Sequence, residues 1–143
     1  MVYTDFLNKV TCVKYAPNGN FLASGDDKGK VKIFSYNEGT KEFVAKKEHS
    51  MLMGAVKDIA FTDDSARLCG VGEGKDYFAK AIIADSGNKL GDLFGPTKNL
   101  LAVDIKKKPY RMALAGEESD IFIFDGVPFK TVKTLHPHSS FIN

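Results

Sequence analysis

Three stretches of the sequence share one pattern: VTCVKY at 10–15, VKDIAF at 56–61 and LLAVDI at 100–105. In each, apolar residues stand at the first, fourth and sixth positions. The starts at residues 10, 56 and 100 recur about every 45 residues, and a fourth start is visible at Ile142. A repeat of this length indicates that one supersecondary unit is used several times along the chain.

Each unit reads as a series of short strands separated by turn residues. In the first, a strand at 10–15 is followed by a Pro-Asn-Gly turn and by strands at 21–24, 30–34 and 42–48. The other two follow the same plan, and no stretch shows the spacing of an amphipathic helix. The sequence therefore predicts an all-β protein with about three four-stranded β-propeller blades. The expected units are 6–48, 52–95 and 97–136, and 138–143 begins a further blade.

Composition excludes several function classes. The net charge is +2, with 43% hydrophobic and 27% charged residues, so no strong field favours nucleic acid or an anionic membrane surface. No apolar run is long enough for a membrane helix. Cys12 and Cys69 lie in apolar runs, which favours buried free thiols in a reducing cytosol, and we expect a cytoplasmic protein. The three histidines have no carboxylate or thiol at ligand spacing, and no catalytic motif is present, so we expect no metal, no cofactor and no enzyme.

The stretch GVGEGKDYF at 70–78 is the one that could suggest nucleotide chemistry. A P-loop needs four residues between its two glycines and a hydroxyl residue after the lysine. Gly70 and Gly74 are one residue too close, Asp76 replaces the hydroxyl, and no helix pattern follows. We interpret the stretch as a loop between strands whose glycines adopt positive φ.

The units resemble WD40 repeats. The segment YAPNGNFLASGDDKGKVKIF at 15–34 follows the strand, turn, strand, Ser-Gly, turn, strand layout of that family. The signature Trp of the family falls on Phe34, Ala84 and Phe124, and the chain contains no Trp. The turn Asp of the family's Asp/Ser/His/Trp network falls on Lys28. That network is therefore incomplete, and we expect packing to hold the blades together.

The sequence is more specifically similar to the actin-interacting branch of WD40 proteins, which assist cofilin in dismantling actin filaments. The matching stretches follow the branch's order and spacing: 2–4 (VYT), 13–19 (VKYAPNG), 23–26 (ASGD), 56–61 (VKDIAF), 71–78 (VGEGKDYF), 85–88 (DSGN), 103–111 (VDIKKKPYR), 126–130 (GVPFK) and 138–143 (HSSFIN). The resemblance implies a non-enzymatic module of the N-terminal propeller that binds actin and cofilin. The alternative is a WD40 scaffold for another complex, because a propeller fold does not fix its partner.

The resemblance also implies where a partner would bind. In this branch, acidic and aromatic residues of the N-terminal propeller contact actin or cofilin, and the matching position here is Glu73. Phe129 with Lys130, and Glu117 with Glu118, are weaker matches, and the turn that carries the two glutamates is one residue shorter than in the branch. Glu73 either pairs with a basic residue of the partner or lies in an inert turn. Phe129 either anchors in a partner's pocket or packs at a blade corner.

Both ends of the chain fall inside the repeat pattern. The residues 2–4 match the last strand of a preceding blade, and 141–143 match the first strand of a following one. Propellers close radially, so three blades alone leave apolar faces and strand edges open. We expect either a piece of a longer protein or an oligomer whose copies cover one another's open faces.

Overall fold

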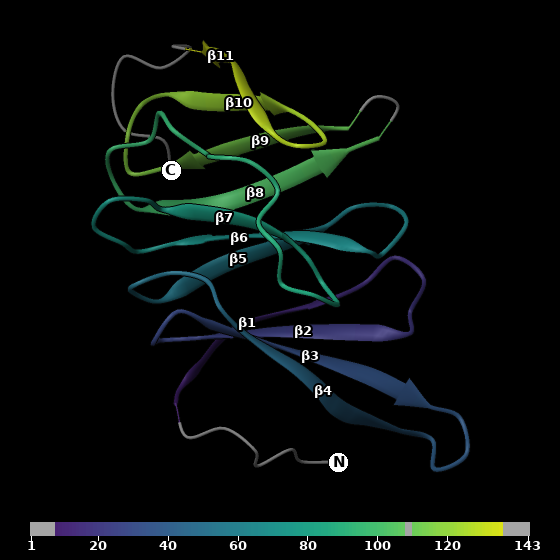
Figure 1. Cartoon of the computed structure of the whole chain (residues 1–143). Helices are drawn as coiled ribbons and strands as arrows, with labels where there is room; N and C mark the ends of the chain where they lie inside the picture. The colour runs from purple at the N-terminus through teal and green to yellow at the C-terminus, as the bar shows by residue number, and fades with distance from the viewer. Residues whose placement is uncertain (1–7, 108–109, 136–143) are drawn as a thin grey trace.

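In the part of the chain that the structure describes, eleven β-strands form three antiparallel sheets, with no helix (Figure 1). The structure is a computed structural model, and it describes residues 8–107 and 110–135. The strand orders are β1-β2-β3-β4, β5-β6-β7 and β11-β10-β9-β8. The strands are β1 (Val10–Tyr15), β2 (Phe21–Asp26), β3 (Lys30–Asn37), β4 (Glu42–Ser50), β5 (Val56–Phe61), β6 (Arg67–Gly72), β7 (Ala79–Ile83), β8 (Leu100–Lys106), β9 (Arg111–Gly116), β10 (Ile121–Asp125) and β11 (Lys130–Leu135). The all-β prediction is confirmed.

The repeat in the sequence is reproduced in the strand pairing. Each repeated stretch is the first strand of a sheet, and its pairing with the second strand shifts register at the same place: between Val10 and Cys12, between Val56 and Asp58, and between Leu100 and Ala102. A bulge at this position increases the local twist of the strand. The three units therefore share a backbone irregularity as well as an apolar pattern.

The second sheet differs from the expected four strands. After β7, the chain turns back and runs beside it briefly, with hydrogen bonds from Ile83 N to Asn88 O (3.0 Å) and from Leu90 N to Ala81 O (2.8 Å). The carbonyl of Leu90 then accepts a hydrogen bond from Phe129 N (3.0 Å) of the third sheet. The chain thus leaves β7 after one bridge, so four strands form in the first and third sheets but only three in the second.

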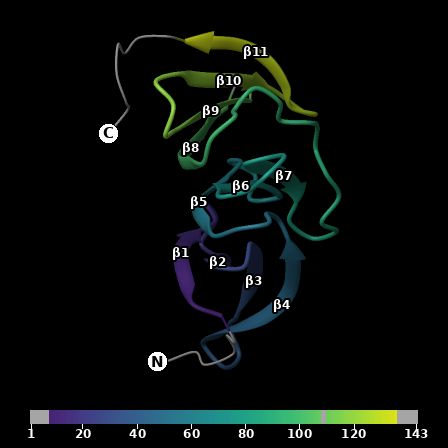
Figure 2. The ribbon, with the colours of Figure 1, turned by 90° about the vertical axis from the view of Figure 1, so that its left-hand side faces the viewer.

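Two buried apolar clusters fill the spaces between the three sheets. One lies between the first and second sheets and includes Val31, Ile59 and Ile82; the other joins the second sheet to the third and includes Leu114 and Phe124. Figure 2 shows the second sheet between the other two. The second sheet is covered on both faces, which is why β6 is buried along almost its whole length.

Hydrogen bonds from side chains also join the sheets. The carboxylate of Asp58 on β5 accepts from Val103 N on β8 (3.0 Å), and the hydroxyl of Thr11 on β1 donates to Val56 O (2.5 Å). The hydroxyl of Ser65 accepts from Asn18 N at 3.1 Å. The apolar clusters agree with the expectation that packing holds the blades together, and polar groups add a bridge between each pair of neighbouring sheets.

The first sheet exposes apolar side chains on β1. Val13 is 60% exposed and Tyr15 63% exposed. The strands expected at 2–4 and 141–143 lie outside the described residues. The unit boundaries 6–48, 52–95 and 97–136 stay a prediction; β4 continues to Ser50, two residues beyond the first of them.

Candidate binding surface

Glu73 lies in the turn between β6 and β7, at the left of the view in Figure 1. Its N–H donates to Ala55 O (2.9 Å), and its own carbonyl accepts from Gly54 N (3.1 Å), so the connection from the first sheet holds the turn in place. The Glu73 carboxylate lies 3.5 Å from the ammonium group of Lys57 on β5, and its side chain is 43% exposed. A half-exposed ion pair of this kind contributes little to stability and exchanges readily with other charges. Glu73 is therefore available to a basic partner group that can replace Lys57.

The glycines around Glu73 do not have the conformation that the sequence suggested. None of Gly70, Gly72 and Gly74 has a positive φ. Gly72 and Gly74 are instead required by close backbone approach: a Cβ at Gly72 would lie 2.0 Å from Ala55 O, and one at Gly74 would lie 2.0 Å from Tyr77 O. The prediction of a loop between strands is correct for 73–78, but the stated role of the glycines is wrong.

Glu117 and Glu118 lie in the turn between β9 and β10, at the same end of the sheets as Glu73 (Figure 1). Glu117 is exposed. The Glu118 carboxylate accepts three hydrogen bonds at one oxygen, from Thr97 N (2.5 Å), Thr97 Oγ1 (2.9 Å) and Lys98 N (3.0 Å). Glu118 thus anchors the connection into the third sheet, whereas Glu117 faces solvent.

Phe129 lies at the other end of the third sheet, in the turn between β10 and β11, and Lys130 is the first residue of β11. Phe129 is 1% exposed and belongs to the apolar cluster between the second and third sheets. Phe129 therefore packs inside this chain, and its ring is not exposed for contact with a partner. Lys130 is exposed and lies opposite Asp125 in the pairing of β10 with β11. The carboxylate of Asp125 accepts two hydrogen bonds from Arg111 (2.6 and 3.3 Å). These bonds lower the pKa of Asp125.

The structure therefore divides the five predicted residues between two ends of the sheets. We call the end that carries the turns 73–78 and 117–120 and the connection 51–55 the turn face. It also holds two exposed apolar side chains that the sequence analysis did not single out, Met53 (61% exposed) and Tyr77 (39% exposed). Met53 follows directly on the buried Met51 and Leu52, and the sequence carries no signal that distinguishes it from them.

The sites expected to be inert can also be placed. Cys69 is buried and Cys12 is partly buried, and both are free thiols; burial raises the pKa of each. The imidazole of His49 lies 2.8 Å from Ala84 O, while His136 and His138 lie outside the described residues. Within 8–107 and 110–135, no group of three or more potential metal ligands comes together. The same residues include no helix of the length and apolarity needed to cross a bilayer.

Comparison with known proteins places this geometry in a family. The family described as WD domain, G-beta repeat (WD40) matches residues 2–35. A solved structure of U3-55K superimposes with a TM-score of 0.82 at 13% sequence identity, over 96% of this chain and 42% of that one. The chain is therefore similar to WD40-repeat proteins. The fold prediction of WD40-type propeller blades is thereby confirmed.

Relatives that match along the whole chain are more specific. WD repeat-containing protein 1 of Rattus norvegicus is 39% identical over 143 residues, which is 99% of this chain and 23% of the relative. Actin-interacting protein 1 of Drosophila melanogaster is 34% identical over 142 residues, again 23% of the relative. The chain thus spans about a quarter of the length of these relatives. The similarity to the actin-interacting branch is confirmed.

The WD40 signature positions explain one polar group in the core. Phe34 and Phe124, in place of the family's Trp, are buried (3% and 0% exposed). The hydroxyl of Ser24 is buried, with no hydrogen-bond partner in the described residues. Since a Phe ring has no N–H to donate to that hydroxyl, as the indole of a Trp would, the family's network is incomplete here, as the sequence predicted.

Proposed function

We propose that this chain is a non-enzymatic binding module that docks on actin filaments and assists their disassembly by cofilin. The observation that carries the proposal is the similarity along the whole chain to a relative named actin-interacting protein 1. The module would act in the cytoplasm, on the cytoskeleton. It makes and breaks no bonds; it shifts filaments toward the cofilin-decorated state by binding that state more tightly.

Glu73 is the residue through which we propose the turn face contacts its partner. Its carboxylate is half exposed and pairs with Lys57 across 3.5 Å. An arginine or lysine of the filament can take the place of Lys57, because the loss of a surface pair costs only about 0–1 kcal/mol. Met53 and Tyr77 supply exposed apolar surface on the same face. Glu117 contributes charge, whereas Glu118 and Phe129 support the module through internal contacts and Lys130 lies at the opposite end.

Co-sedimentation with actin filaments, with and without cofilin, tests the proposal. We expect the chain to pellet with filaments, and more of it when cofilin is present. The variant Glu73→Ala should reduce the pelleted fraction, whereas Lys57→Ala should leave it unchanged or increase it. Glu42→Ala is a matched control, because Glu42 is an exposed carboxylate at the start of β4, away from the turn face. The proposal would be contradicted if the chain did not pellet with filaments in either condition, or if the pelleted fraction of Glu73→Ala equalled that of the parent.

The alternative is a WD40 scaffold for a different complex. The same experiment separates the two, because a scaffold for other proteins would not respond to cofilin on the filament. A nucleotide-hydrolysis assay addresses the remaining enzyme hypothesis, for which we expect no activity above background.

We also propose self-association through the first sheet. Val13 and Tyr15 project from the same face of β1 and are 60% and 63% exposed. Light scattering should show oligomers that dissociate in the double variant Val13→Ser, Tyr15→Ser but not in Met53→Ser, which removes a side chain of similar exposure on the turn face. A parent chain that is monomeric and melts cooperatively would exclude this proposal.

A further inference from the structure

An open hollow of about 600 Å³ lies between the first and second sheets, at the end opposite the turn face. Residues of β2, β3 and β4 line one side of it, and the turn between β5 and β6 and the end of β7 line the other. Both sheets belong to this chain, so the hollow forms without any further blade. Its volume is within the range of about 300–1,000 Å³ that is usual for ligand sites.

The floor of the hollow is apolar. It is the outer margin of the cluster between the first two sheets: Ile33 belongs to that cluster, and Phe21 and Ala84 pack against it. Phe21, Ala84 and the neighbouring Ile83 are only partly buried. Apolar surface is thus left in contact with water, and a large apolar side chain of a partner would cover it.

The register of β4 places two lysines on the rim of the hollow. In the pairing of β3 with β4, Ile33 lies opposite Lys47. The next residue, Phe34, lies opposite Ala45, so Lys46 is the extra residue of a β-bulge. Neighbouring residues of a regular strand point to opposite faces, but a bulge re-aims side chains, and here Lys46 and Lys47 both line the hollow. Two ammonium groups therefore lie along one side of the apolar floor.

One positive charge at the hollow has no compensating partner. Asp64 on the opposite rim pairs with Arg67 at 3.1 Å. Lys47 lies 3.9 Å from Asp85, whose side chain is 90% exposed, so this pair exchanges readily with other charges. Lys46 is exposed and makes no ion pair within 8–107 and 110–135. An anionic group of an occupant would therefore meet an unpaired cation.

A buried hydroxyl adds a hydrogen-bond donor on the side away from the lysines. Ser65 lines the hollow and is 3% exposed, and its backbone has φ +61, a conformation that is uncommon for residues other than glycine. Its Oγ accepts from Asn18 N at 3.1 Å, whereas its O–H has no acceptor in the part of the chain that the structure describes. A hydroxyl both donates and accepts, so an oxygen of an occupant can complete its bonding.

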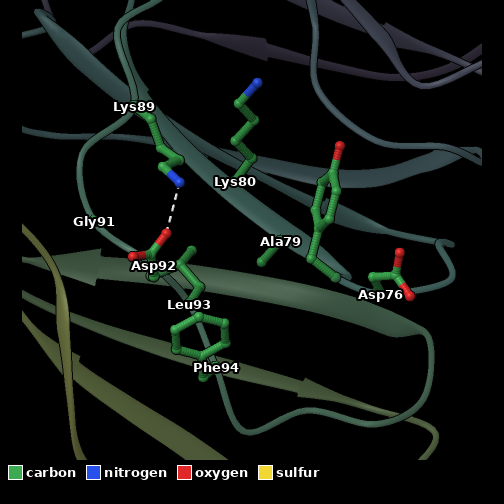
Figure 3. Close-up of a pocket in the computed structure, with 9 residues that line it drawn as sticks. Asp76, Ala79, Lys80, Lys89, Gly91, Asp92, Leu93 and Phe94 are labelled. Atoms are coloured by element: carbon green, nitrogen blue, oxygen red, sulfur yellow. Dashed lines mark hydrogen bonds and ion pairs between the residues drawn. The ribbon is translucent and has the colours of Figure 1, made fainter.

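The hollow beside β7 lacks this combination of groups (Figure 3). There Lys89 is turned toward Asp92, at 2.6 Å. The ammonium group of Lys80 donates to Ser50 O of the first sheet, at 3.2 Å. Both lysines are thus engaged within the chain. Of these two hollows, only the one at Lys46 joins an apolar floor to an unpaired cation.

We propose that the hollow at Lys46 binds a short, extended segment of another protein in which large apolar side chains alternate with acidic residues. The apolar side chains cover the floor, and one carboxylate pairs with Lys46. A second carboxylate displaces Asp85 from Lys47. A peptide fits better than a small acid, because its backbone carbonyls can also accept from the Ser65 hydroxyl. Glu73 lies at the other end of β6, so the site is independent of the proposed actin contact.

Fluorescence anisotropy of the peptide fluorescein-Gly-Gly-Asp-Phe-Glu-Leu-Asp-amide, titrated with the full chain, tests the proposal. In one control peptide, Asn and Gln replace the acidic residues; in the other, Ser replaces Phe and Leu. We expect both controls to bind at least about fivefold more weakly, because each lacks one of the two kinds of contact. In NMR spectra, the parent peptide should shift the amide signals of Lys46, Ala66 and Ala84, which line the hollow.

Protein variants locate the site independently. Lys46→Glu should weaken binding of the parent peptide about tenfold or more, whereas Lys28→Glu should leave it unchanged. Lys28 is an exposed lysine in the turn between β2 and β3, and its replacement changes the net charge by the same amount. Ala84→Trp, which fills the hollow, should also weaken binding. Urea midpoints of the variants verify that they remain folded.

Several results would overturn the proposal. One is equal binding to Lys46→Glu and Lys28→Glu, and another is the absence of binding at millimolar peptide. Equal binding of the parent peptide and the peptide without acidic residues would show that charge plays no part. Equal binding of the peptide with Ser would show charge attraction alone. Shifts at Ala84 that grow with protein concentration in the absence of peptide would identify a second copy as the occupant, and would equally overturn the proposal.

Discussion

Replacing Gly72 by Ala should destabilise the chain, while the same change two residues earlier at Gly70 should not. Both glycines lie in β6 with φ outside the positive region, so their backbone conformations suit alanine. At Gly72, the added Cβ would lie 2.0 Å from Ala55 O and 2.9 Å from Lys57 N, both backbone atoms. At Gly70, the nearest atom is the terminal methyl group of Met51, at 3.4 Å. A flexible methyl group can move aside, but the backbone leading into β5 cannot.

The size of the effect follows from these contacts. Overpacking a well-packed site costs about 1–3 kcal/mol. The displaced carbonyl of Ala55 also loses its hydrogen bond from Glu73 N (2.9 Å), which adds about 0.5–1.5 kcal/mol. Alanine has less conformational freedom than glycine in the unfolded chain, and this raises the free energy of unfolding of both variants by about 0.4–1 kcal/mol. We therefore expect Gly72→Ala to lower the free energy of unfolding by about 1–3.5 kcal/mol, and Gly70→Ala to leave it unchanged or raise it slightly.

Urea denaturation followed by far-ultraviolet circular dichroism measures this difference, since the chain has no Trp for fluorescence. With a slope of about 2 kcal/mol per molar urea, the midpoint of Gly72→Ala should fall by about 0.5–2 M. The midpoint of Gly70→Ala should match or slightly exceed that of the parent. Equal midpoints for the parent and Gly72→Ala, or a loss in Gly70→Ala as large as that in Gly72→Ala, would refute the argument from backbone approach.

Three further predictions concern groups between and within the sheets. Asp58→Ala should lower the free energy of unfolding by about 1–3 kcal/mol, because Val103 N is left without its acceptor. Asp58→Asn keeps an acceptor oxygen and should lower the free energy of unfolding by less. The urea midpoints of the two variants measure this difference. In a thiol titration with a disulfide reagent at pH 8, Cys12 should react first and Cys69 only after unfolding, because Cys69 is fully buried and its thiol pKa is raised; equal rates would argue against that burial. The pKa of Asp64 is lowered, chiefly by the hydrogen bond from the Thr62 hydroxyl. The contribution of Asp64 to stability is therefore present above its unfolded pKa near 4, and it is lost as the pH falls through the lower folded pKa. Asp64→Asn should therefore flatten the acid limb of the stability–pH curve, and an unchanged limb would show that other carboxylates dominate it.

Some of the candidate site could be predicted from the sequence, and some could not. Turn residues between two apolar runs placed Glu73 in a connection between strands, and the structure agrees. Its pairing with Lys57 could not be predicted, because that contact depends on how β5 and β6 are registered. Phe129 shows the same limit: a Phe after a Pro suits either a corner or a partner contact, and the distant segment at Leu90 decides that it is buried.

The sequence by itself determined the β-strands, the repeat and the absence of a complete WD40 polar network. These depend on side-chain alternation and on residue types at fixed spacing, which act locally. Only the tertiary structure decided that the second sheet stops at three strands, since the carbonyl of Leu90 can pair with either β7 or Phe129, and the choice depends on a segment almost forty residues away. The same holds for Gly72: its sequence context suggests a turn glycine, but the carbonyl of Ala55 lies where its Cβ would be, and only the folded chain brings the two together.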